Sequence, residues 1–345
     1  MDLARASVAL QALKMPAFRL DQLRRAVFTE AAASYGEIAV LPASLRESLE
    51  RDLPLMSLTR KLVKVSADKR AHKALLTLSD GRVIETVLLR PSETRWTTCI
   101  SSQVGCAIGC TFCATGLMGF SRDLTPEEIT DQVLFWRQYM KAEGLAGRID
   151  NVVYMGMGEP FAAYEPVAQS LRILMDQKQF GIGARHISVS TSGLAPQMER
   201  FGRDFPQINL ALSLHAANDA LRTKLVPLNK AYPLARLAEA LKTYLALTPR
   251  KVFLEYVMLR GENDRPQDSQ DLIAWVKSVG TLELLHVNLI VYNQTDTPHE
   301  ATAEEGARRF QSALLSAGLH ATVRQNLGRD IQGACGQLIA SEPKP

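Results

Sequence analysis

The N-terminal part of the chain shows the hydrophobic spacing of short helices. Between about residues 5 and 52, apolar residues recur every three or four positions and form one helical face, made of Leu20, Leu23, Val27 and Phe28. Pro16 and Pro42 interrupt the pattern, because proline cannot continue a helix. The spacing predicts a small helical domain over residues 1–55.

The next part is typical of β-strands. Residues 61–66 and 74–89 contain alternating and β-rich runs, and Asp80-Gly81 within the second run is a pair that favours a tight hairpin turn. We therefore expect a β hairpin linker over residues 56–95.

From Thr97 onward, apolar strand-like runs alternate with helical segments. The runs cover residues 151–157, 186–190, 209–213, 251–258, 286–292 and 321–324. Such alternation predicts an α/β fold with a parallel sheet and crossover helices. One helix start is well marked, with Thr125 as N-cap, Pro126 in the first turn and Glu127 and Glu128 at the positive end of the helix dipole. Because polar motifs recur where successive strands end, we favour a curved, partly open (β/α) barrel over a doubly wound sheet.

Length and composition fit one large α/β unit with an appendage. The chain has 345 residues, of which 46% are hydrophobic and 22% charged, ordinary values for a globular protein. We expect no membrane association, since no apolar run is long enough to span a bilayer and the first residues do not resemble a signal peptide. Only five cysteines are present, which excludes a disulfide framework and favours a reducing, cytoplasmic location.

The charge is unevenly distributed. The net charge is +4, but residues 1–100 hold 16 Lys and Arg against 11 Asp and Glu. A basic strip stands out there, consisting of Arg60, Lys61, Lys64, Lys69, Arg70 and Lys73, with Asp68 as its one acidic residue. Such a strip can contact phosphates, although solvated surface charge accounts for it equally well.

Cys106, Cys110 and Cys113 form a C-x-x-x-C-x-x-C motif. Three thiolates this close can each bind one iron of a [4Fe-4S] cubane and leave the fourth iron without a protein ligand. The alternative is a zinc site, but such sites are usually closed by four ligands, and no fourth Cys or His lies nearby. The motif resembles that of the radical S-adenosylmethionine (SAM) superfamily, in which the free iron chelates SAM and a reduced cluster splits it into methionine and a 5′-deoxyadenosyl radical.

Polar motifs at the predicted strand ends are candidates for a SAM site. They are Met155-Gly-Met-Gly-Glu-Pro160, Ser190-Thr-Ser-Gly193, Ser213-Leu214-His215 and Tyr292-Asn293. In barrel enzymes such positions converge on one ligand. Gly158 would allow close backbone approach to the SAM amino group, and Glu159 would accept from that ammonium or from the ribose. Ser190 and Asn293 would bond ribose or carboxylate oxygens, whereas His215 fits a packed strand-end histidine almost as well.

Further motifs make the resemblance narrower. They are Cys99-Ile-Ser-Ser-Gln-Val-Gly-Cys106, Ser213-Leu-His-Ala216, Lys224-Leu-Val-Pro-Leu-Asn229 and Asp330-Ile-Gln-Gly-Ala-Cys335-Gly-Gln-Leu338. Together with the motifs above they resemble the radical-SAM 23S rRNA adenine methyltransferases of the RlmN/Cfr family. The resemblance implies a partial (β/α)6 TIM-like radical-SAM barrel over residues 96–340, preceded by a helical RNA-binding domain. It also implies one [4Fe-4S] cluster, two SAM per turnover, and 23S rRNA as substrate, with tRNA modified by some members.

By this resemblance Cys335 takes a methyl group from SAM, and Cys99 later attacks the Cys335 sulfur to form a disulfide that releases the product. Glu85 is matched to the base that removes the ring proton. Without the resemblance, Cys99 and Cys335 would pass as free buried thiols and Glu85 as an edge-strand carboxylate.

The position methylated is not decided by the motifs. Gly158-Glu-Pro160 and Ser190-Thr-Ser-Gly193 resemble the enzymes that methylate adenine carbon 2, whereas Cys113-Ala-Thr-Gly116 and residues 286–293 are also similar to the resistance-conferring carbon-8 branch. The sequence departs from the family pattern at Ile331-Gln-Gly-Ala-Cys335, where the family commonly has Asp and a second Ala before the cysteine.

We expect a monomer with a flavodoxin- or ferredoxin-type electron donor. A non-enzymatic iron-sulfur RNA-binding protein is the alternative from another class.

Overall fold

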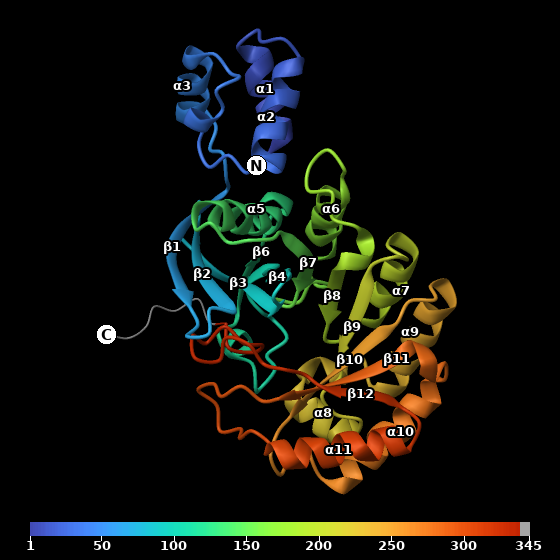
Figure 1. Cartoon of the computed structure of the whole chain (residues 1–345). Coiled ribbons are helices and arrows are strands. Elements are labelled where there is room, and N and C mark those ends of the chain that lie inside the picture. Colours follow the sequence, from blue (N-terminus) through green and yellow to red (C-terminus); the bar gives the residue numbers. More distant parts are fainter. Residues whose placement is uncertain (339–345) are drawn as a thin grey trace.

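A ten-stranded curved sheet organises the computed structural model, which describes residues 1–338; residues 339 and 340 of the predicted barrel segment lie outside the described residues (Figure 1). Its strands, in spatial order, are β1 (Leu58–Val65), β2 (Ala71–Leu78), β3 (Val83–Ser92), β4 (Arg95–Cys99), β7 (Ile149–Tyr154), β8 (Ile187–Thr191), β9 (Asn209–Ser213), β10 (Val252–Met258), β11 (Leu285–Val291) and β12 (His320–Val323). Strands β1 to β4 pair antiparallel, and every pair from β4 to β12 is parallel. The sequence-predicted α/β partial barrel is confirmed.

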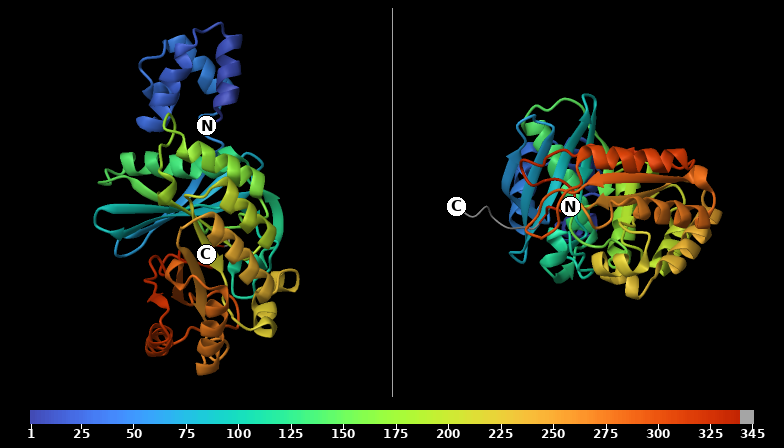
Figure 2. Two further views of the ribbon diagram at one scale, coloured as in Figure 1. Left: turned by 90° about the vertical axis from the view of Figure 1, so that its right-hand side faces the viewer. Right: turned by 90° about the horizontal axis from the view of Figure 1, so that it is seen from below.

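Helices cover the outside of the parallel strands (Figure 2). They are α5 (Pro126–Ala142), α6 (Tyr164–Met175), α7 (Ala195–Asp204), α8 (Asp219–Leu225), α9 (Leu234–Leu247), α10 (Pro266–Val279) and α11 (Glu304–Ser316). The predicted start of α5 is confirmed. Thr125 Oγ1 accepts from the Glu128 amide at 3.2 Å, and the Glu128 carboxylate accepts from the Thr125 amide at 2.9 Å, which is a capping box. None of the helices within residues 1–338 combines the length and apolar character needed to cross a bilayer.

The N-terminal helices α1 (Leu3–Ala12), α2 (Phe18–Arg24) and α3 (Ala43–Asp52) stand above α5 (Figure 1). A π-helical turn, Arg25–Thr29, continues α2, and a short 3-10 turn, Tyr35–Glu37, precedes α3. Buried apolar residues fill the space between them, and Arg137 of α5 donates to the Phe28 carbonyl at 2.9 Å. This hydrogen bond ties the helical part to the barrel.

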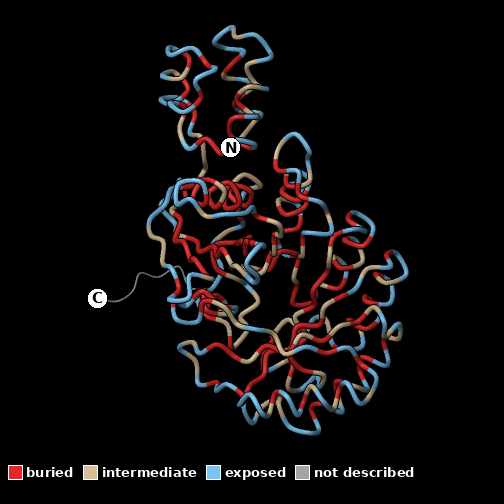
Figure 3. The backbone as a smooth tube through the Cα atoms, viewed as in Figure 1, coloured by how far each residue is buried: buried red, intermediate tan, exposed pale blue. Residues whose placement is uncertain are grey.

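The β hairpin predicted as a linker belongs to the main sheet. Strands β2 and β3 pair antiparallel across the Asp80-Gly81 turn, and β3 pairs in turn with β4. The segment with the hairpin therefore extends the barrel sheet by three strands, β1, β2 and β3. The red trace in Figure 3 is continuous along most of β2 and covers Ile84 to Leu88 of β3.

Two further short strands, β5 (Gln103–Gly105) and β6 (Phe120–Asp123), pair antiparallel on either side of the three-cysteine loop, and α4 (Ala114–Leu117) begins directly after Cys113. The Gly119 carbonyl accepts from the Cys106 amide at 2.9 Å, which closes the base of the loop.

Candidate active site

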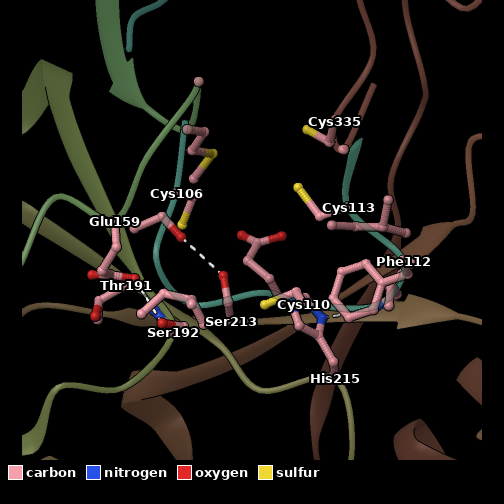
Figure 4. A pocket seen from close by; sticks show the side chains of 18 of the residues that line it. Cys106, Cys110, Phe112, Cys113, Glu159, Thr191, Ser192, Ser213, His215 and Cys335 are labelled. Carbon is pink, nitrogen blue, oxygen red and sulfur yellow. Dashed lines mark hydrogen bonds between the residues drawn. The ribbon is translucent and has the colours of Figure 1, made fainter. Parts of the chain in front are cut away.

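A cavity of about 170 Å³ lies at the carboxyl ends of the parallel strands. Ten of the residues expected from the sequence line it, namely Cys106, Cys110, Cys113, Gly158, Glu159, Ser190, Ser213, His215, Asn293 and Cys335. They come from the cluster loop, from the ends of β7, β8, β9 and β11, and from the segment after β12. Figure 4 shows that the labelled side chains surround one open space.

The three cysteines of the loop line this cavity and are partly buried. Burial raises the pKa of Cys106 to about 12, and burial also raises the pKa of Cys110 and of Cys113, with mutual repulsion of the sulfurs as a smaller cause. A thiol in this state needs nearby positive charge to ionise, and a bound iron centre supplies it. Three such thiols around one space fit a cubane with one open iron. Within residues 1–338, no three His, Cys, Asp or Glu side chains come together closely enough to hold a single metal ion.

The end of β7 has the backbone shape that the sequence suggested. Gly158 has φ +103°, and a Cβ there would lie 2.5 Å from the Gln103 side chain, so only glycine fits. The Glu159 carboxylate is buried and largely used inside the protein. It accepts from the Ser192 amide and hydroxyl, both at 2.7 Å, and from the Phe161 amide at 3.0 Å. Glu159 therefore joins the ends of β7 and β8 besides facing the cavity.

The ends of β8 and β9 also meet. Ser190 Oγ and Ser213 Oγ lie 3.1 Å apart, and both line the cavity. Leu214, by contrast, is fully buried and does not line the cavity, and its carbonyl accepts from Arg222 Nε at 3.0 Å.

His215 is both a lining residue and a packed one. Its Nδ1 accepts from the Val257 amide at 3.1 Å, and its ring meets the Phe112 ring edge-on with centroids 4.9 Å apart. Burial, together with the charge of Arg222, lowers the pKa of His215 to about 3. The imidazole is therefore neutral at physiological pH.

The loop after β12 brings Cys335 to the cavity. Asn293 donates to the Cys335 carbonyl at 3.1 Å and accepts from Arg329 at 2.9 Å, and the Gly336 carbonyl accepts from the Ala114 amide at 2.8 Å. Cys335 is exposed. The loop thus rests against the cluster loop and the end of β11.

Cys99 does not line the cluster cavity. It lines an adjoining cavity of about 280 Å³, together with Leu327 and Ala334 among others. Met155, Arg324 and Cys335 line both cavities. Cys335 therefore stands at the wall between the cluster side and Cys99. Burial raises the pKa of Cys99 to about 12.

Glu85 lines neither cavity. It is fully buried on β3 and forms an ion pair with Lys73 of β2, with Nζ and Oε1 3.0 Å apart. The prediction that Lys73 belongs to an exposed basic strip is therefore wrong, because Lys73 is buried and cannot contact a phosphate. Arg70 is half-buried and donates to the carbonyls of Arg90 and Pro91. Arg60, Lys61 and Lys69 are exposed, as a phosphate-binding strip requires.

Two charged residues of the cavity were missed. Glu255 of β10 is buried, its Oε1 accepts from Asn288 at 3.0 Å, and its Oε2 has no hydrogen-bond partner. Arg324 lies 3.7 Å from that oxygen. Burial raises the pKa of Glu255, and Arg324 opposes the rise. The sequence feature that could have indicated Glu255 is its position as a lone acidic residue within an apolar strand, residues 252–258.

Comparison with known proteins decides the family. The model of the Radical SAM superfamily matches residues 100–273. The chain is 40% identical over 351 residues to a probable dual-specificity RNA methyltransferase RlmN of Chloroflexus aurantiacus, covering all of this chain and 93% of that protein. The chain belongs to the RlmN/Cfr family of radical SAM methyltransferases.

Other relatives agree with this assignment. A ribosomal RNA large subunit methyltransferase Cfr of Clostridium botulinum is also 40% identical, over 94% of this chain and 93% of that protein. The crystal structure of a radical SAM methyltransferase from Sphaerobacter thermophilus superimposes with a TM-score of 0.92 at 41% identity, covering 99% of this chain and 98% of that one. The family resemblance predicted from the motifs is confirmed, and with it an enzyme of this class.

Proposed function

We propose that this enzyme methylates a ring carbon of an adenine in 23S rRNA, with carbon 2 as the favoured position and a methylated Cys335 as intermediate. The observation that carries the proposal is the position of Cys335, which lines both the cavity of the cluster cysteines and the cavity of Cys99. A thiol in this position can meet a methyl donor on one side and a second thiol on the other.

The chemistry explains why two cysteines are needed. Carbons 2 and 8 of adenine have no nucleophilic lone pair, so direct polar transfer from the SAM sulfonium is not feasible. When bound, the [4Fe-4S] cluster, held by Cys106, Cys110 and Cys113, supplies the electron that generates a 5′-deoxyadenosyl radical from SAM. The Cys335 thiolate first takes a methyl group from one SAM by displacement. The 5′-deoxyadenosyl radical would take a hydrogen atom from that methyl group, and the carbon radical left on Cys335 would add to the adenine ring. The unpaired electron of the adduct would return to the oxidised cluster, so two SAM are used per turnover.

Release of the product requires the other two residues. Glu85 accepts the ring proton, and the Cys99 thiolate attacks the Cys335 sulfur. A sulfur-sulfur bond forms as the sulfur-carbon bond breaks, and the departing carbon takes up a proton. The resulting disulfide must be reduced before the next turnover.

Our candidates for the SAM site are Gly158, Glu159, Ser190, Ser213, Leu214, His215 and Asn293. A neutral His215 is suited to pack against or hydrogen-bond a neutral part of the cofactor.

Residues 1–55 are proposed as an RNA-binding domain, 56–95 as the hairpin linker and 96–340 as the methyltransferase core. We further propose a cytoplasmic monomer, reduced by a flavodoxin- or ferredoxin-type protein.

The names of the relatives bear on the substrate. The name of one relative, a dual-specificity RNA methyltransferase, is in keeping with a second RNA substrate, for which we propose tRNA. Carbon-8 methylation of the rRNA adenine is the alternative, and another relative is named a ribosomal RNA large subunit methyltransferase Cfr. Mass spectrometry of 23S rRNA and tRNA from a strain that expresses the protein tests both. A 2-methyladenine in rRNA is the expected product, whereas 8-methyladenine alone would contradict the favoured position.

Variants of the two thiols test the intermediate. Cys335→Ala is expected to retain the cluster but to leave RNA unmethylated. Cys99→Ala is expected to trap protein on RNA, because only Cys99 can displace the carbon from the Cys335 sulfur. Denaturing gels after turnover with labelled RNA show the adduct. Free methylated RNA from Cys99→Ala would refute the assignment.

A separate measurement tests the cofactor. Replacing Cys106, Cys110 or Cys113 by Ala is expected to abolish the brown absorbance and the release of 5′-deoxyadenosine, whereas Cys335→Ala serves as a matched cysteine control that keeps the absorbance. Stoichiometric zinc without iron in anaerobically purified protein would favour the zinc site, and a cluster without SAM cleavage would favour the non-enzymatic RNA-binding protein.

A further inference from the structure

A buried ammonium group joins two parts of the molecule that the proposed reaction uses. Lys73 is only 3% exposed, and its Nζ donates to Glu85 Oε1 at 3.0 Å and to the Gln332 carbonyl at 3.2 Å. Gln332 lies three positions before Cys335. Lysine is almost never fully buried unless it is paired, so these two contacts account for its place in the interior.

The sheet register puts Lys73, Glu85 and Cys99 on one face. Lys73 lies opposite Val87 of β3, and Val87 lies opposite Cys99 of β4. Residues paired across antiparallel strands point to the same face, and Glu85 shares that face because it lies two positions from Val87. The cavity of Cys99 and Cys335 is therefore on the side of the sheet to which Lys73 and Glu85 point.

The hairpin holds the Cys335 loop at three points. Besides the bond from Lys73, the Ala67 amide donates to Asp330 at 2.9 Å, and Gly328 packs so tightly that a Cβ there would lie 2.8 Å from the Ala71 Cβ. Gln332 has φ +54°, a conformation that non-glycine residues seldom adopt without support. The charge-assisted bond from Lys73 to the carbonyl of this same residue supplies such support.

We propose that Lys73 is a positioning residue that sets Glu85 and the Cys335 loop in one arrangement, because the same ammonium group pairs with the Glu85 carboxylate and holds the loop against the hairpin. The inference rests on the proposed function for the roles of Glu85 and Cys335. A buried carboxylate that loses a cationic neighbour binds a proton more readily and is a poorer base. Lys73 thus acts through two other residues and does not itself touch the reacting atoms.

Four variants distinguish the effect of the Lys73–Glu85 ion pair from that of the hydrogen bond between Lys73 and the Gln332 carbonyl. Lys73→Met removes both of them and takes the cationic partner away from the buried Glu85 carboxylate, which can unfold the protein. The double variant Lys73→Met with Glu85→Leu replaces the whole pair by apolar groups, a change that buried ion pairs often tolerate. Glu85→Gln keeps Lys73 and its bond to Gln332. Lys242→Met breaks a surface ion pair with Glu239 of similar length, 2.9 Å, and is the matched control.

Hydrogen exchange of the anaerobic holoenzyme, followed by mass spectrometry of peptides that cover residues 328–338, measures the loop without RNA or turnover. We expect Lys73→Met and the double variant to speed exchange there about tenfold. Glu85→Gln and Lys242→Met are expected to match the wild type. Wild-type exchange in the double variant would overturn the proposal, as would equally fast exchange in Glu85→Gln.

A second readout concerns Glu85. With labelled RNA, Lys73→Met is expected to methylate Cys335 and then to accumulate the covalent protein-RNA adduct, because proton removal is impaired. Loss of both Cys335 methylation and adduct in a folded variant would contradict the positioning role. Since hydrogen exchange needs neither SAM nor RNA, it stays informative if the proposed reaction itself is wrong.

Discussion

At the scale of single residues, burial decides which groups carry charge. His215 is buried, and its imidazole nitrogen accepts a backbone hydrogen bond that protonation would break. Its pKa is lowered from 6.5 to about 3, so the unfolded state binds a proton more readily than the folded state between these values. Stability from this residue is therefore present above pH 6.5 and is lost as the pH falls toward 3.

The variant His215→Asn tests this sign. Asparagine tolerates the φ of +62° found here and does not titrate. Between pH 7 and pH 5, we expect the free energy of unfolding of the wild type to fall by about 2 kcal/mol more than that of the variant. Urea unfolding of anaerobic protein at the two pH values, followed by tryptophan fluorescence, measures the difference. Parallel losses in both proteins would show that His215 is accessible to protons in the folded state.

At the scale of elements, local signals in the sequence were reliable where the chemistry is local. The start of α5 at Pro126 was readable because a cap needs only neighbouring residues, and the Asp80-Gly81 turn for the same reason. The three cysteines were found by spacing alone. The burial of Lys73, which was predicted to be part of an exposed basic strip, and the place of Glu255 in the cavity were not predicted, because Gln332 for the first and Arg324 for the second come from distant parts of the chain. A short window of sequence around either residue does not contain these partners.

The cap of α5 allows a direct measurement. Thr125→Ala removes the hydroxyl that accepts from the Glu128 amide, while Thr125→Ser keeps an oxygen in the same place. We expect the alanine variant to lower the free energy of unfolding by about 1 kcal/mol and the serine variant to change it much less. Urea denaturation at pH 7 compares them. An alanine variant as stable as the serine variant would mean that the Arg122 and Glu128 contacts alone hold this end of the helix.

At the scale of the whole molecule, the hairpin is both a support for the Cys335 loop and a basic edge of the sheet. Its inner face holds Lys73, Glu85 and the loop, and exposed Arg60, Lys61 and Lys69 lie on its outer parts. An RNA phosphate bound at these residues would lie on the same hairpin that holds the Cys335 loop. The proposed RNA binding and the order of this loop would then depend on one element.

Salt dependence tests whether the hairpin binds RNA. Each phosphate contact that is lost lowers the slope of log K against log salt by about 0.7 to 0.9, because fewer counterions are released on binding. Changing Lys61, Lys64 and Lys69 together to Ala is expected to weaken binding to a labelled 23S rRNA fragment and to reduce the slope by up to about 2.1 to 2.7. A matched triple variant of exposed lysines outside the hairpin, Lys178, Lys242 and Lys277 to Ala, removes the same charge and is expected to keep the wild-type slope. Equal slopes for the two triple variants would show that the hairpin lysines act only through net charge and make no phosphate contacts.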